Sequence, residues 1–226
     1  MPPTSSLGSR RYSVAGLLLA AVLTVWAGPL GFSTSISAVL VGQYVLRFGQ
    51  ATQERLLGWQ GFLKLLGTEA QAGRESALLA TVNRYFNRER FLSDIAHWGV
   101  EDYWATPAEF VASDGGDCED FSIAKYYALK ELGVPIARLR LIYVKSSKLK
   151  QAHMVLAYYS TPKAEPLILD SLDDEVRPAS QRPDLIPVYS FNDEDVLIAG
   201  RGSVGSPSQI RMWRDLTGRL EREARI

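Results

Sequence analysis

The spacing of hydrophobic side chains changes once along the chain, and this change limits the fold classes open to it. Up to residue 132 the apolar residues recur every three or four positions, which is typical of helices that bury one face. From residue 138 to residue 170 they alternate with other residues and are rich in Val, Leu, Ile and Tyr, which indicates β-strands. Helices followed by strands predict an α+β fold, and 226 residues suffice for one well-buried core.

Two helices and an irregular stretch are predicted in the first half of the chain. One helix is expected over residues 36–66 and another over residues 75–86, with a polar linker at 67–73 between them. Residues 95–107 are too rich in Trp and Pro to form a regular element. We expect this aromatic stretch to line a site.

A third helix has the clearest boundaries in the sequence. Asp117 is a good N-cap, and Asp120 three residues later gives a weak capping-box relation. Gly133 and Pro135 end the helix. Cys118 is therefore predicted to be the first residue of this helix.

Three strands are predicted after this helix, over residues 138–145, 153–159 and 167–170. If residues 160–163 form the turn between the last two strands, His153 lies directly opposite Asp170. A slip of one residue would destroy this relation. The remaining chain, 172–226, is predicted to be irregular apart from one amphipathic tail helix, which carries Ile210, Trp213, Leu216 and Leu220.

The N-terminal segment has the pattern of an export signal. The basic pair Arg10-Arg11 precedes an apolar run over residues 14–27, which ends at Gly28. The run is shorter than the roughly 20 residues that span a bilayer, so we expect a cleaved signal, with an uncleaved anchor as the alternative. The predicted segments are a signal or anchor at 1–27, a catalytic domain at 28–200 and a tail at 201–226.

Few residues are available for chemistry at neutral pH. The chain has one Cys and two His, which excludes an intramolecular disulfide and a cysteine-rich zinc site. Twenty-five Lys and Arg balance 25 Asp and Glu, so the long-range field with which proteins gather nucleic acids is absent. We therefore expect no nucleic-acid partner.

Cys118, His153 and Asp170 form a candidate catalytic triad. A thiol at a helix N-terminus is expected to have a lowered pKa, an imidazole can take its proton, and a carboxylate can orient the imidazole. Each residue alone has an ordinary structural explanation, and His97 is a competing base. The backbone N–H of Cys118 is expected to be one oxyanion donor, and Trp104 and Gln151 are the candidates for the second.

The acids beside Cys118 conflict with a thiolate. Asp117 and Glu119 would disfavour its charge unless a divalent cation neutralises them, and oxygen ligands point to calcium rather than zinc. Three acids, with Asp120, are too few for a site without carbonyls and water. The alternative, slightly favoured by sequence physics alone, is that acids in the first turn only complement the helix dipole.

Five blocks of sequence together resemble the bacterial transglutaminase-like cysteine proteinases of the LapG type. The Asp-Cys-Glu-Asp and Gln-Ala-His-Met sequences are the most specific of them. The blocks are Trp98–Pro107, Gly116–Tyr127, Gln151–Tyr159, Leu167–Asp170 and Arg182–Asn192.

This resemblance implies a papain-like, transglutaminase-type fold in a periplasmic endopeptidase. It places the nucleophile at Cys118, the base at His153 and the orienting acid at Asp170. It also implies calcium beside the nucleophile, at the positions of Asp117 and Glu119, with Asp120 less closely matched. The implied substrate is a large surface adhesin, cut near its N-terminus at a paired-alanine site so that a biofilm disperses. An inner-membrane receptor of the LapD type would sequester the protease when cyclic di-GMP is high.

Two other functions fit the same residues. A transglutaminase or amide acyltransferase would pass the acyl group from Cys118 to an amine instead of water. A non-catalytic periplasmic adaptor would bind its receptor through exposed aromatic side chains such as Trp98 or Trp104.

Overall fold

The computed structural model describes residues 36–69 and 75–226. The predicted signal or anchor at 1–27 lies outside the described residues. Within the described ranges, no helix combines the length and the apolar character needed to cross a membrane.

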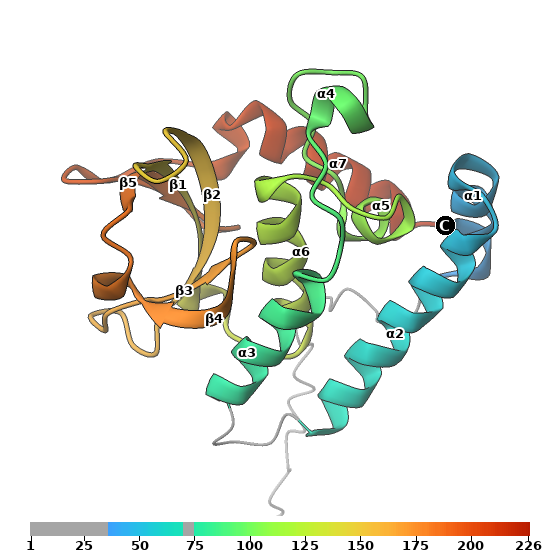
Figure 1. Ribbon diagram of the computed structural model, residues 1–226, viewed down its shortest axis with the longest axis horizontal. Coiled ribbons are helices and arrows are strands. Elements are labelled where there is room, and N and C mark those ends of the chain that lie inside the picture. Colours follow the sequence, from blue (N-terminus) through green and yellow to red (C-terminus); the bar gives the residue numbers. More distant parts are fainter. Residues whose placement is uncertain (1–35, 70–74) are drawn as a thin grey trace, which may run out of the picture. The chain divides into compact units, whose positions relative to one another are not determined.

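The described chain folds into an N-terminal group of helices, one antiparallel sheet and a C-terminal helix, which confirms the predicted α+β class (Figure 1). The helices are α1 (Ala38–Phe48), α2 (Ala51–Glu69), α3 (Glu75–Phe86), α4 (Asp94–His97), α5 (Pro107–Ala112), α6 (Cys118–Glu131) and α7 (Arg211–Glu223). The strands are β1 (Leu139–Ser146), β2 (Gln151–Tyr158), β3 (Leu167–Asp170), β4 (Asp173–Pro178), β5 (Leu185–Phe191), β6 (Val196–Ile198) and β7 (Gly202–Gly205). Their order in the sheet is β4-β3-β2-β1-β5-β6-β7.

Helix α6 is the central element of the core. It packs against β1, β2 and β3 on one side and contacts α3 and α5 on the other (Figure 1). Its residues from Asp120 to Leu129 are all buried. Because a helix buried on all sides cannot shift without disturbing each neighbour, α6 holds Cys118 in a fixed place relative to the sheet.

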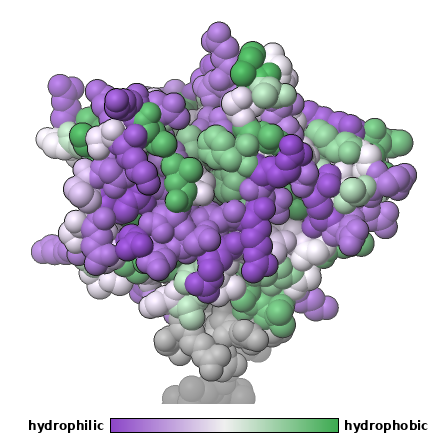
Figure 2. All heavy atoms as spheres, viewed as in Figure 1, coloured by the Kyte–Doolittle hydropathy of each residue, from purple (hydrophilic) through white to green (hydrophobic). Residues whose placement is uncertain are grey.

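The two faces of the sheet bury different side chains. Met154 and Leu156 of β2 join the main core with α6, whereas Val155 and Ala157 belong to a smaller apolar cluster on the opposite face. A cavity of about 390 Å³ lies on that second face. The molecular face in Figure 2 is mainly hydrophilic, with separate hydrophobic groups rather than one continuous apolar patch.

The predicted first helix is wrong in one respect, because it is two helices. Gly49 ends α1 with a φ of 93°, a conformation that strains residues with a Cβ, and α2 begins at Ala51. Helix α2 then runs to Glu69, so the start of the predicted linker at 67–73 is helical. The irregular stretch at 95–107 also overlaps a single helical turn, α4.

The predicted register between β2 and β3 is wrong by two residues. Leu156 pairs with Leu169 and Tyr158 with Leu167, so the connection is longer than the predicted turn at 160–163. Extending this register places Val155, not His153, opposite Asp170. A shift by two keeps both side chains on one face, since strand side chains alternate with period two. His153 and Asp170 are thus diagonal neighbours.

The C-terminal region contains more regular structure than predicted. Strands β4 to β7 lie within the stretch expected to be irregular. The predicted tail helix is confirmed as α7, whose Trp213, Leu216 and Leu220 are buried in the main core. Strand β7 pairs with β6, so residues beyond 200 are continuous with the sheet and the core.

Replacing Gly115 by Ala is expected to destabilise the turn that leads into α6. Gly115 has a φ of 135°, and an added Cβ would overlap the carbonyl oxygen of Arg90. Urea unfolding should show a loss of about 3 kcal/mol or more, from backbone strain plus the clash.

Gly133→Ala is the matched control for this prediction. Its φ is 88°, but nothing lies within 4 Å of an added Cβ, so only strain of about 1–2 kcal/mol is expected. Equal losses in the two variants would contradict the proposed close approach at Gly115.

Candidate active site

The structure places Cys118 at the first position of α6, as predicted. The Asp120 carboxylate accepts a hydrogen bond from the backbone N–H of Asp117 at 3.3 Å, which closes one side of the expected capping box. Asp120 also accepts from the backbone N–H of Ala105 at 2.7 Å and is fully buried. It therefore ties the first turn of α6 to the aromatic stretch before α5.

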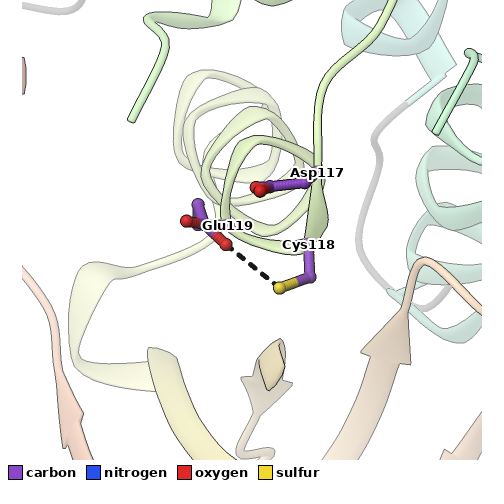
Figure 3. Close-up of side chains that lie close together, drawn as sticks. All are labelled: Asp117, Cys118 and Glu119. Carbon is purple, nitrogen blue, oxygen red and sulfur yellow. Dashed lines mark hydrogen bonds between the residues drawn. The ribbon is translucent and has the colours of Figure 1, made fainter. Parts of the chain in front are cut away.

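The predicted lowering of the thiol pKa is wrong for the protein chain by itself. Cys118 Sγ donates to Glu119 Oε2 at 3.0 Å, and Figure 3 shows this contact within the first turn. Burial, followed by the charges of Glu119 and Asp117, raises the pKa of the Cys118 thiol far above its ordinary value. These effects outweigh the helix N-terminus and the Met154 backbone amide, which act in the opposite direction.

His153 and Asp170 form a buried hydrogen-bonded pair. His153 Nε2 lies 2.7 Å from Asp170 Oδ1, and the two side chains are 2% and 0% exposed. The other carboxylate oxygen, Oδ2, accepts from Arg182 Nη2 at 2.7 Å. Although burial raises it, the hydrogen bonds from His153 and Arg182 hold the pKa of Asp170 well below its usual range. Asp170 is thus an anion at neutral pH.

The first turn of α6 contacts β2 immediately after His153. Ser122 Oγ donates to the carbonyl oxygens of Cys118 at 2.8 Å and Met154 at 3.0 Å. In this part of the described chain, however, no hydrogen bond joins the Cys118 thiol to His153 or Asp170, because the thiol donates to Glu119. The structure thus pairs the predicted base and acid and bonds the turn that carries Cys118 to the residue after His153, without a thiol–imidazole bond.

The competing base and the suggested oxyanion donors lie elsewhere or stay untested. His97 Nε2 bonds to Ser113 Oγ at 2.8 Å, and burial lowers the pKa of its imidazole. Trp104 is buried and stacks on Phe191, so it is wrong as an exposed docking residue for an adaptor. Gln151 is exposed at the start of β2. A second oxyanion donor stays a prediction.

Two acids that sequence reasoning missed complete a cluster around the first turn of α6. Ligand atoms of Asp94, Asp102 and Glu119 lie within 4.8 Å of one another, and so do those of Asp94, Asp117 and Asp120. Asp94 starts α4 and Asp102 follows in the aromatic stretch, at least 15 residues before Asp117 in the chain. The only signal was the expectation that residues 95–107 line a site.

The cluster has the chemistry of a cation site. Asp94 Oδ1 and Asp117 Oδ1 are buried and have no hydrogen-bond partner among the described residues. Burial and neighbouring acids raise the pKa of Asp94 to about 7 and that of Asp117 to about 8. The backbone N–H of Tyr103 donates to the other oxygen of Asp94 at 2.6 Å, so each carboxylate keeps one buried oxygen that needs a proton or a cation. Oxygen-only ligands suit a hard ion such as calcium. The residues present therefore fit a divalent metal.

Three solved structures that are similar to the chain are of one bacterial protein. Legionella pneumophila LapG is 39% identical, with a TM-score of 0.69 over 82% of this chain and 96% of that one. Its EGTA-treated form gives the same identity and TM-score and is covered to 98%. Its calcium-bound form is 38% identical, with a TM-score of 0.67 over 82% of this chain and 99% of that chain. No curated protein matches the chain.

A family model agrees with these structures. The model of the bacterial transglutaminase-like cysteine proteinases matches residues 67–185, a range that contains α6 and strands β1 to β4. This range also contains the thiol, the imidazole–carboxylate pair and the acid cluster described above. The chain therefore belongs to the bacterial transglutaminase-like cysteine proteinase family.

Proposed function

We propose that the protein is a calcium-dependent periplasmic cysteine endopeptidase that cleaves the N-terminal region of a large surface adhesin. The observation that carries this proposal is a helix-start cysteine with an acid cluster next to its thiol, in the same domain as a buried, hydrogen-bonded His153–Asp170 pair. Membership of a cysteine proteinase family and similarity to LapG support it.

The proposed roles follow from the hydrogen bonds of the three residues. Because His153 bonds to Asp170 through Nε2, its Nδ1 is the nitrogen left to accept the Cys118 proton. The sulfur would attack the scissile carbonyl, the backbone N–H of Cys118 would stabilise the oxyanion, and the imidazolium would protonate the leaving amine. A water deprotonated by His153 would then hydrolyse the acyl-enzyme and restore the thiol.

Asp94, Asp102, Asp117 and Glu119 are the residues proposed to hold calcium. Bound calcium would neutralise the acids that disfavour a thiolate. It would also bind Glu119, which accepts a hydrogen bond from the thiol in this structure. Asp120 was also predicted as a ligand, but two backbone N–H groups already occupy its oxygens. We therefore propose that Asp120 mainly holds the turn.

The biological setting is proposed from the family resemblance. The N-terminal segment 1–27 would direct export to the periplasm. The substrate would be an adhesin with a paired-alanine cleavage site, whose release promotes biofilm dispersal. An inner-membrane receptor of the LapD type would sequester the enzyme at high cyclic di-GMP.

Cys118→Ala is expected to abolish cleavage of an adhesin N-terminal fragment, since no other thiol exists in the chain. Gel analysis of fragments with and without the paired alanines would measure this, with thermal melting as the control for folding. Residual proteolysis in the folded variant would end the proposal. Adding a primary amine separates hydrolysis from acyl transfer, because a transferase would yield an amine adduct.

His153→Gln is expected to lower kcat by about 100-fold or more, because the thiol loses its proton acceptor. His97→Gln is the matched control and should keep near-normal activity, since His97 bonds to Ser113. The reverse ranking of the two variants would make His97 the base.

Removal of calcium with EGTA is expected to stop cleavage, and added calcium should raise the melting temperature of the folded protein. Asp102→Asn should increase the calcium concentration for half-maximal cleavage at least about tenfold. The neighbouring Glu101→Gln is the matched control, because Glu101 is also exposed but lies outside the cluster. Full activity in EGTA would leave the acids with a structural role only.

A further inference from the structure

Asp170 is held from two sides by groups of positive or donor character. His153 Nε2 bonds to Oδ1 at 2.7 Å, and the backbone N–H of Leu172 donates to the same oxygen at 3.1 Å. Arg182 Nη2 bonds to Oδ2 at 2.7 Å. The carboxylate is fully buried, so its charge depends entirely on these contacts.

Arg182 is itself fixed before it reaches Asp170. Its Nε and Nη2 donate to the two carboxylate oxygens of Asp184, both at 3.0 Å. Its backbone N–H donates to Ala179 and its carbonyl accepts from Leu185, so the main chain on both sides is also tied. The Arg182 side chain is only 11% exposed and lines the cavity on the second face of the sheet. A buried guanidinium held in this way keeps its Nη2 in a constant position relative to Asp170.

The charged groups around Asp170 come from β2, α6, β4 and the segment before β5, but only two of them touch its carboxylate. Lys125 of α6 bonds to Asn87 Oδ1 at 2.6 Å, and Asn87 in turn donates to the backbone carbonyl of Asp170 at 3.0 Å. Asp174 of β4 accepts from Asn87 and adds negative charge nearby. Of the charged groups, His153 and Arg182 are therefore the ones that contact the carboxylate directly. If Arg182 were absent, an imidazolium at His153 would be the remaining direct counter-ion.

We propose that Arg182 is a positioning residue that balances the charge of Asp170, so that His153 stays neutral and its Nδ1 stays free for the Cys118 proton. Asp184 holds the guanidinium in place for this purpose. The catalytic meaning of the inference rests on the proposed function, whereas the charge balance itself does not.

The test is the titration of His153 in the full chain carrying Cys118→Ala, followed by NMR of labelled histidine. The chain has two histidines, so a His97→Gln variant assigns both sets of ring signals. In Arg182→Met the titration midpoint of His153 is expected to move to higher pH by about one to three units, because the imidazolium becomes the counter-ion of Asp170. Arg182→Lys should restore part of the difference.

Arg177→Met is the matched control. Arg177 lies on β4 and pairs with Asp173 and Glu175 rather than with Asp170, so the His153 midpoint should not move. An unchanged or lower midpoint in folded Arg182→Met would overturn the proposal.

Asp184→Asn keeps the inference testable if Arg182→Met does not fold. Removing this acid releases the guanidinium from its clamp, so the His153 midpoint should rise by less than in Arg182→Met, and an unchanged or lower midpoint would contradict the proposed role of Asp184.

A kinetic measurement links the inference to catalysis. Arg182→Met should lower kcat about tenfold or more with little change in KM, because the substitution affects the base His153 and leaves the contacts with the substrate intact. If wild-type protein fails to cleave the adhesin fragment, the proposed function fails, while the NMR titration still decides the role of Arg182.

Discussion

The cost of burying carboxylate charge is the constraint on which the site depends. The protein meets this cost differently at each acid. Two backbone N–H groups donate to Asp120, and His153 with Arg182 compensates Asp170. Asp94 and Asp117 keep buried oxygens for which the described chain offers no donor. These oxygens without a donor belong to the acid cluster beside the thiol. The acids that disfavour a thiolate are therefore in the cluster best suited to bind a cation.

Helix α6 and strand β2 connect the buried acids of the helix end with the His153–Asp170 pair. The buried helix carries Cys118 and its acids, and Ser122 bonds the first turn to the carbonyl oxygen of Met154. Met154 directly follows His153, whose side chain belongs by alternation to the opposite face of the sheet. The site thus lies where a helix end meets a strand. Packing on one face of the sheet and ion pairing on the other both fix its geometry.

Local signals in the sequence were sufficient for the elements that carry Cys118 and Asp170. The cap at Asp117 and the stop at Gly133 located α6, and the alternating residues located β3. The long-range arrangement of the elements was harder to predict from the sequence. The connection between β2 and β3 has no tight turn to set the register. The many charged residues of β4 do not show the apolar alternation by which strands are predicted, and the break between α1 and α2 depends on Gly49. Asp94 and Asp102 could not be found because tertiary folding alone brings them to Glu119. The thiol was mispredicted because burial outweighed the helix terminus.

The diagonal relation of His153 and Asp170 has a consequence for how such hairpins can diverge during evolution. Because strand side chains alternate, mutations that move the pairing of Leu156 and Leu169 by an even number of residues leave the imidazole and the carboxylate on the same side. A change of odd parity would send one of the two side chains into the α6 core, and natural selection would remove it.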